Sequence, residues 1–231
     1  MNRARRMAAL QARTLANAGF DVLQIDLLGC GDSSGDFAEA TWASWLVDVS
    51  LGYQWLRTQT TAPLTLWGLR AGCLLAASAA VDLPETPNLI FWQPVISGKQ
   101  HWQRFVRLKI AAELSSGQTK GVAEQIKQQL AAGHAVEIAG YKVSPALAER
   151  LQNAELIPPA GYSGRVAWLE LSSRENATLP PLHQSRIEQW RDAKVTVDAR
   201  MINGPAFWQN AEIEEAPELL AETLAVLESW Q

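Results

Sequence analysis

The fold is decided by the stretch Pro63-Leu64-Thr65-Leu66-Trp67-Gly68-Leu69-Arg70-Ala71-Gly72-Cys73-Leu74. An apolar, alternating run ends in Gly68-Leu69-Arg70-Ala71-Gly72, and small and apolar residues follow as far as Val81. This pattern predicts a strand, a sharp turn and a helix. The glycine spacing is that of the nucleophile elbow Gly-x-Ser-x-Gly, whose strained middle residue presents a nucleophile above a parallel sheet. Here the middle residue is Arg70, and a guanidinium is cationic at any working pH and is not a nucleophile.

Length and composition limit the fold classes and the kinds of partner that this chain can have. The chain has 231 residues, 48% of them hydrophobic, and a formal net charge of −4. This length suits one α/β domain with a small insertion, or two small domains. The charge gives no reason to expect a nucleic-acid partner, and no apolar run approaches the roughly 18 residues that cross a bilayer. The two cysteines, Cys30 and Cys73, do not make a disulfide framework, so we expect a cytoplasmic protein.

Strands and helices alternate along most of the chain. Residues 3–18 predict a helix that Gly19 ends, and residues 20–26 predict a strand. Thr41 is placed as the N-cap of the next helix. Further strands are expected at 88–95, 166–171 and 195–197, and further helices at 71–84, 182–191 and from Pro217. Such alternation implies a mostly parallel sheet with helices on both faces and right-handed crossovers.

Between Ser97 and about Pro159 the sequence pattern changes from alternating strands and helices to helices. Helical spacing of apolar residues marks two amphipathic helices there, and Ser144-Pro145 gives an N-cap followed by proline at the first helical position. We therefore expect a helical cap at 97–160, inserted into a core made of 1–96 and 161–231.

Together these stretches resemble the α/β-hydrolase fold. The chain is most similar to exosortase A system-associated hydrolase 2, a bacterial family found beside exosortase and exopolysaccharide genes. The stretches that carry this resemblance are Met1-Asn2-Arg3-Ala4-Arg5-Arg6-Met7, Asp26-Leu27-Leu28-Gly29-Cys30-Gly31-Asp32-Ser33, Gly68-Leu69-Arg70, Gly133-His134-Ala135-Val136-Glu137-Ile138-Ala139-Gly140-Tyr141 and Phe207-Trp208. An arginine at the elbow is itself typical of that family.

The resemblance implies that the first three strands of the fold would precede Met1. The third of them normally lies beside the elbow strand, and its loss would leave backbone groups of two central strands without partners. We therefore expect the chain to be an N-terminally shortened version of a longer protein, a prediction that the DNA upstream of Met1 tests.

The residues of a Ser-His-Asp triad are not recognisable. A serine hydrolase of this fold needs a nucleophile on the elbow, an acid after a late strand and a histidine after the last strand. The elbow carries Arg70, and the late loop 203–216 holds no histidine. Glu175 stands where the acid is expected. The role of that acid is to orient the catalytic histidine, and no histidine is present where one is needed. Ser-type catalysis is therefore not the expected mechanism.

The two cysteines are the other candidate nucleophiles, and each also has a structural interpretation. Cys73 lies in the first turn of the elbow helix, where the helix N-terminus and Arg70 would lower a thiol's pKa, or it simply packs against the sheet. Cys30 lies in a glycine-rich loop near the ends of the strands, where ligands bind, or it is a packing residue. His183 is expected on the surface. His101, His134 and His183 are too far apart in sequence to suggest a metal motif, and no cofactor motif is present.

Arg70 also suggests a site of its own. A guanidinium at a helix N-terminus, beside free backbone N–H groups such as that of Ala71, suits a carboxylate or phosphate. Four aromatic residues are candidates to cover this site: Phe207, Trp208, and Trp102 and Phe105 of the cap. The alternative is a structural salt bridge to an acid, with Asp26 and Glu175 as the candidates.

Two functions follow. By resemblance the chain is a hydrolase of the ester or thioester class, associated with exosortase or exopolysaccharide proteins and working without a Ser-His-Asp triad. Alternatively it is a catalytically inactive relative that binds an anionic or acyl ligand, or a partner protein, at the Arg70 elbow. The residues themselves favour the second.

Overall fold

The computed structural model describes residues 2–114, 121–209 and 212–231. The chain divides into two compact units. The sheet unit comprises Met1–Ile25, Gly52–Ile96 and Ile157–Gln231, and the helical unit comprises Asp26–Leu51 and Ser97–Leu156. Helix α2 (Trp42–Gln59) begins in the helical unit and ends in the sheet unit.

The sheet unit is built on four parallel strands. Their order is β1-β2-β5-β6, with bounds β1 (Thr65–Leu69), β2 (Asn88–Trp92), β5 (Arg165–Ser172) and β6 (Thr196–Asn203). All three pairings are parallel, which places the carboxyl ends of the strands at one edge of the sheet. Parallel strands need crossovers, and helices supply them, as the alternation in the sequence predicted.

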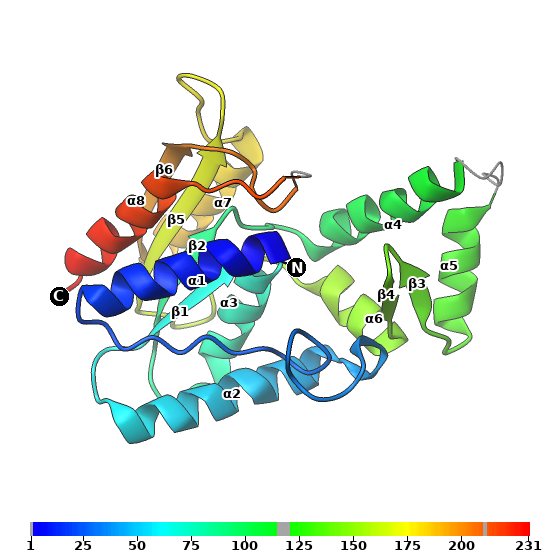
Figure 1. The fold of residues 1–231 in the computed structure, drawn as a ribbon, viewed down its shortest axis with the longest axis horizontal. Coiled ribbons are helices and arrows are strands. Elements are labelled where there is room, and N and C mark those ends of the chain that lie inside the picture. The colour runs from blue at the N-terminus through cyan, green and yellow to red at the C-terminus, as the bar shows by residue number, and fades with distance from the viewer. Residues whose placement is uncertain (1, 115–120, 210–211) are drawn as a thin grey trace. The chain divides into compact units, whose positions relative to one another are not determined.

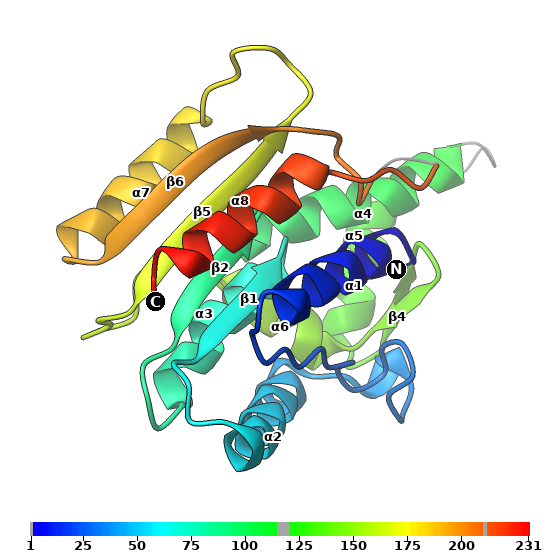
Figure 2. The ribbon, with the colours of Figure 1, turned by 60° about the vertical axis from the view of Figure 1, so that its left-hand side comes forward.

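Helices cover both faces of this sheet (Figures 1 and 2). On one face lie α1 (Asn2–Asn17) and α8 (Pro217–Glu228), and on the other lie α3 (Gly72–Asp82) and α7 (Pro181–Asp192). The core under α1 and α8 includes Met7, Trp92, Leu169, Leu219 and Val226. A mostly parallel sheet between two helical layers is the expected fold class.

The end of α1 and the start of α2 lie where the sequence predicted them, because capping residues bond to the terminal backbone groups. Gly19 has φ 88°, and the Phe20 N–H donates to the Leu15 oxygen at 3.1 Å, which ends α1. The Thr41 hydroxyl accepts the Ser44 N–H at 3.0 Å and so caps α2.

One predicted strand is wrong. Residues 20–26 belong to no strand and no helix, and Val22, Leu23 and Ile25 are each 36% exposed. The composition of this segment favours a strand, but a strand exists only when a neighbour satisfies its backbone groups. Among the described residues, no strand lies hydrogen-bonded to this segment.

The helical unit contains the three predicted helices and one hairpin that was not expected. The helices are α4 (Gly98–Leu114), α5 (Val122–Ala131) and α6 (Pro145–Asn153), and the hairpin strands are β3 (Val136–Ile138) and β4 (Tyr141–Val143). Ser144 caps α6, and its hydroxyl donates to the Ala40 oxygen at 2.7 Å. A short helical turn, η1 (Phe37–Glu39), packs its Phe37 ring on Tyr141. The segment before Gly52 therefore packs with the inserted helices.

Candidate functional site

The elbow has the predicted geometry. Strand β1 ends at Leu69, and α3 begins at Gly72. Between them Arg70 has φ 56°, a backbone conformation that costs a non-glycine residue of order 1–3 kcal/mol. The backbone passes so close to α3 that a Cβ on Gly68 would lie 2.5 Å from the Gly72 oxygen. Glycine is therefore required at this position of the turn.

The elbow gathers donors at the carboxyl edge of the sheet. The Arg70 guanidinium donates to the Gln93 backbone oxygen at 3.3 Å and lies 5.4 Å from the centre of the Trp208 ring. The N–H groups of Ala71 and Gly72 donate to no group within the described part of the chain. The elbow thus combines a cationic side chain with two backbone donors at the start of α3, which is a combination that attracts an anion.

Neighbouring residues hold this arrangement in place. Gln93 itself has φ 43°, its N–H donates to the Leu169 oxygen at 2.7 Å, and its side-chain oxygen accepts the Leu171 N–H at 2.7 Å. These bonds fix the carbonyl that Arg70 contacts. The Arg70 backbone N–H in turn donates to the Trp92 oxygen at 3.0 Å. The position of the guanidinium is consequently tied to β2 and β5.

The two aromatic residues proposed for this site have different roles. Trp208 contacts Arg70, as the sequence suggested. Phe207 is fully buried in the core, with its ring edge-on to Trp92 and Trp208 at 6.3 and 5.1 Å. Phe207 therefore supports Trp208 from behind and exposes no surface to a ligand.

The two thiols have environments that disfavour the thiolate. Cys73 is 0% exposed, and its Sγ–H contacts the Gly68 oxygen at 3.2 Å. Burial raises the pKa of this thiol strongly, against the smaller opposing effect of Arg70. Burial also raises the pKa of the half-buried Cys30, and the charges of Asp26 and Asp48 raise it further. Cys73 in particular has the environment of a packing residue.

We expect iodoacetamide to modify Cys30 slowly and to leave Cys73 untouched in the folded protein. A raised pKa means that the thiolate of Cys30 accumulates only as the pH rises above the usual range of a cysteine. Its alkylation rate should therefore keep increasing beyond pH 9. Mass spectrometry of the alkylated protein measures both sites, with a denatured sample as the control. Rapid modification of Cys73 at pH 7 would contradict this assignment.

The histidines and the expected acid do not assemble into a triad with the elbow. Glu175 is exposed in the loop after β5. His183, predicted to be on the surface, is only partly exposed, and its Nδ1 lies 2.6 Å from Oε1 of Glu170. Glu170 is 1% exposed and also accepts the Trp168 Nε1–H at 2.7 Å. The sequence signal for this pair is the single carboxylate within the apolar strand Val166–Leu171.

Within residues 2–114, 121–209 and 212–231, no group of three or more His, Cys, Asp or Glu side chains is placed to hold a metal ion. No helix in these ranges combines the length and apolar character that crossing a bilayer requires.

The comparisons place the fold among known structures. No family model and no curated protein matches the chain. Among solved structures, it is similar to Est1E from Butyrivibrio proteoclasticus with bound ferulic acid, at 18% identity and a TM-score of 0.65, covering 98% of this chain and 83% of the other. It is also similar to a thermostable carboxyl esterase from Bacillus coagulans, at 11% identity and a TM-score of 0.63, covering 97% and 85%.

A third similar structure belongs to the metagenome-derived lipolytic enzymes LipS and LipT, at 16% identity and a TM-score of 0.58, covering 96% of this chain and 88% of the other. These neighbours are esterases and lipases, and the chain has their α/β-hydrolase fold. Fold alone does not carry their chemistry over to this chain.

Proposed function

We propose that this α/β-hydrolase-fold protein binds a ligand bearing a carboxylate at the Arg70 elbow and performs no Ser-His-Asp catalysis. One observation carries the proposal. The elbow, which presents a nucleophile in serine hydrolases, here carries Arg70, and the next two residues, Ala71 and Gly72, have N–H groups that donate to no group among the described residues.

The chemistry of the site favours a planar anion with an apolar body. A guanidinium offers parallel donors that match a carboxylate, and helix N-terminal N–H groups favour negative charge. Trp208 adds an aromatic surface next to the cation. Two similar structures hold acids of this kind: Est1E binds ferulic acid, and a tomato methylketone synthase variant binds β-ketoheptanoate. These two acids are suitable probes.

We expect Arg70→Ala to weaken ferulate binding at least about tenfold, because a hydrogen bond to a charged group contributes about 1.5–3 kcal/mol. Titration calorimetry with ferulate and with β-ketoheptanoate measures the affinity. Arg174→Ala, at an exposed position in the loop after β5, is the matched control. If Arg70→Ala lowers the melting temperature but leaves the affinity for ferulate unchanged, Arg70 forms a structural salt bridge instead. No change in either quantity would exclude both roles.

Hydrolysis of an ester or thioester is the second candidate, and the similarity to esterases and lipases favours it. Short- and long-chain acyl p-nitrophenyl esters and acyl thioesters test it, with Arg70→Ser, Cys73→Ala and Cys30→Ala in parallel. Turnover that a single cysteine substitution abolishes would establish a thiol enzyme. No turnover, together with a ligand-induced rise in melting temperature, supports the binding function.

The cellular setting is also part of this proposal. The resemblance of the sequence to exosortase A system-associated hydrolase 2 suggests a role beside exosortase or exopolysaccharide proteins, and the cysteine content suggests the cytoplasm. Co-purification of the tagged protein with exosortase-system proteins from a cell lysate tests the association.

A further inference from the structure

We propose that the outward face of α2 is a self-association surface, through which two copies of this chain pair by antiparallel helix packing about a two-fold axis at Leu51. The outward face consists of the exposed residues of this helix, which are Ala43, Val47, Leu51, Gln54, Trp55, Thr58 and Gln59. The proposal is independent of the ligand at Arg70, because no residue of α2 belongs to that site.

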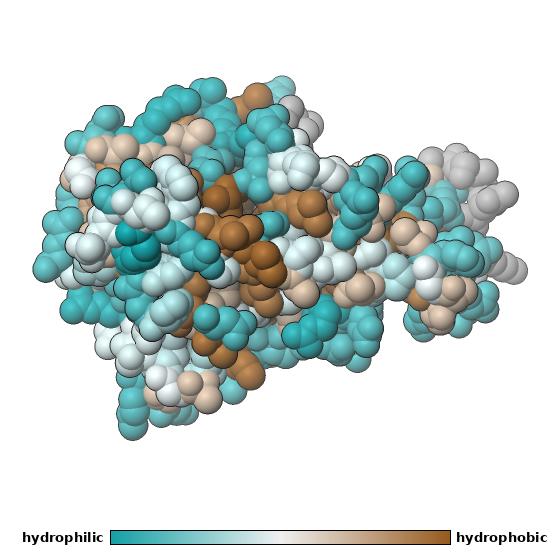
Figure 3. Space-filling model, turned by 90° about the horizontal axis from the view of Figure 1, so that it is seen from below, coloured by the Kyte–Doolittle hydropathy of each residue, from teal (hydrophilic) through white to brown (hydrophobic). Residues whose placement is uncertain are grey.

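The first observation is a row of three large apolar side chains exposed along α2. Val47 and Leu51 are each 56% exposed, and Trp55 is 54% exposed. These residues are four apart, so they share one side of a single helix. Figure 3, which looks at the side where α2 lies, shows apolar surface among hydrophilic residues. Single exposed apolar residues are common on proteins, but a contiguous row of them marks an interaction surface.

The second observation is that the outward face of α2 carries no charge. Asp48 and Arg57 are the only charged residues of this 18-residue helix. Asp48 accepts the Leu28 N–H at 2.7 Å, and Arg57 pairs with Glu85, so both charges are engaged within the chain. The solvent face of a helix is normally polar and charged. Helix α7 of this chain has such a face, with three exposed charged residues: Glu188, Arg191 and Asp192. The outward face of α2 is therefore built for a contact rather than for water.

The lack of charge on this face indicates the kind of partner. A partner of different sequence is usually recognised by complementary charges, which the outward face does not offer. A two-fold interface is different, because it brings each residue close to itself or to its counterpart in the other copy. Any charge near the axis would then meet a charge of the same sign. A neutral face avoids this repulsion, so the composition of α2 fits a second copy of the chain.

The spacing of the apolar row also fits a second copy. Val47 precedes Leu51 by four residues, and Trp55 follows it by four. In an antiparallel pair with the axis at Leu51, the two Leu51 side chains meet, and Val47 of each copy faces Trp55 of the other. A small side chain thus faces a large one on both sides of the axis. A parallel pair would instead place two tryptophans together at one end of the contact. Rows of residues four apart are also the ridges that most commonly interdigitate between helices.

The size of the face limits the strength of the dimer. Helix α2 has 18 residues, which makes it about 27 Å long. One helix packed on its copy buries less surface than the interfaces of permanent dimers, and small interfaces are typical of transient complexes. We therefore expect a reversible dimer with a dissociation constant in the micromolar range or weaker.

Sedimentation equilibrium of the 231-residue chain, at concentrations up to several hundred micromolar, measures this association. We expect a shift from monomer to dimer as the concentration rises. Leu51→Asp should weaken the dimer at least about thirtyfold, because two carboxylates then meet at the axis in place of two apolar side chains. Leu182→Asp is the matched control, because Leu182 on α7 is 63% exposed and lies outside the outward face. It should leave the dimer unchanged, and circular dichroism checks that both variants are folded.

A charge-swap mixture tests whether the partner is a second copy with its axis at Leu51. Leu51→Lys alone should weaken the dimer as Leu51→Asp does, since two ammonium groups meet. An equimolar mixture of the two variants should associate at least about tenfold more tightly than either alone, because opposite charges then face each other across the axis. A chain that stays monomeric throughout would leave the face to a different partner and overturn the proposal. Association that Leu51→Asp does not weaken, or a mixture that associates no better than its components, would overturn it as well.

Discussion

Replacing His183 with leucine is expected to lower the free energy of unfolding by about 1–3 kcal/mol, which is the usual cost of removing one hydrogen-bond partner from a buried polar group. The reason is Glu170, which is 1% exposed and accepts hydrogen bonds from His183 Nδ1 at 2.6 Å and from Trp168 Nε1 at 2.7 Å. Leucine leaves the carboxylate buried with a single donor. For a chain of this length the melting temperature should fall by about 2–12 °C, which scanning calorimetry measures.

The double variant His183→Leu/Glu170→Leu is the control for this prediction. Exchanging a buried pair for apolar residues of similar volume is often neutral or stabilising, because both desolvation costs disappear. The double variant still orphans the Trp168 indole N–H, so we expect it to recover part of the loss rather than all of it. A single variant that unfolds at the same temperature as the unsubstituted protein would show that the pair contributes nothing.

Local backbone chemistry explains which parts of this structure the sequence could predict. The elbow was predictable because the glycines in Gly68-Leu69-Arg70-Ala71-Gly72 have the spacing of a known strand-turn-helix motif, and the structure confirms the turn with φ 56° at Arg70. The ends of α1 and α2 were predictable because Gly19 and Thr41 act on backbone groups only a few residues away. Such signals depend on residues that are close together in the chain, so they can be recognised without knowledge of the tertiary structure.

Long-range partners explain what the sequence could not show. Residues 20–26 have the composition of a strand, but pairing decides strands, and the described residues offer no partner. His183 was assigned to the surface because its partner, Glu170, lies on a different element. Phe207 was expected to cover the Arg70 site, but it is buried, and nothing in its local sequence shows that its ring packs against Trp92.

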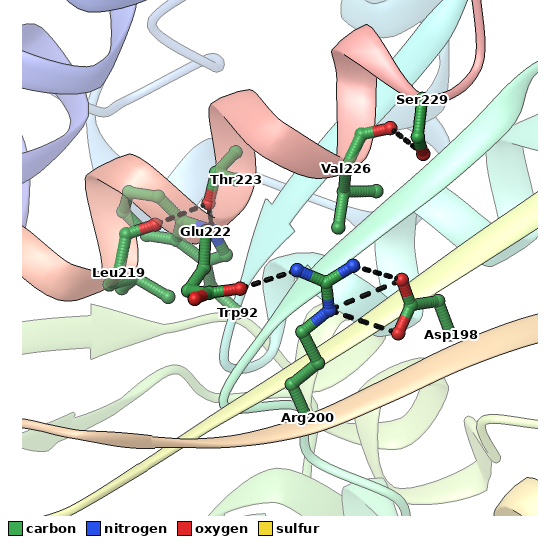
Figure 4. Close-up of polar contacts among 8 residues, drawn as sticks. All are labelled: Trp92, Asp198, Arg200, Leu219, Glu222, Thr223, Val226 and Ser229. Carbon is green, nitrogen blue, oxygen red and sulfur yellow. Dashed lines mark hydrogen bonds and ion pairs between the residues drawn. The ribbon is translucent and has the colours of Figure 1, made fainter.

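Replacing Trp92 with alanine is expected to cost about 3–5 kcal/mol, because the large indole leaves a cavity in the core. Trp92 is 1% exposed, its ring packs edge-on against Trp67 at 4.5 Å, and its Nε1–H donates to the Thr223 hydroxyl at 2.9 Å (Figure 4). The melting temperature should fall by about 6–20 °C. Thr223→Val is the matched control, because it removes the hydrogen-bond acceptor and keeps the shape. It should cost only about 1–3 kcal/mol.

The same substitution tests whether the core positions the ligand site. The Trp92 backbone oxygen accepts the Arg70 N–H, and its ring contacts Phe207, which backs the Trp208 ring beneath the guanidinium. We therefore expect Trp92→Ala to weaken ferulate binding as well as stability, even at a temperature where the variant is fully folded. Thr223→Val should leave the affinity unchanged, because it disturbs neither contact. If a folded Trp92→Ala variant binds ferulate as tightly as the unsubstituted protein, then β2 alone holds Arg70 in place, through the backbone and not through the aromatic side chains.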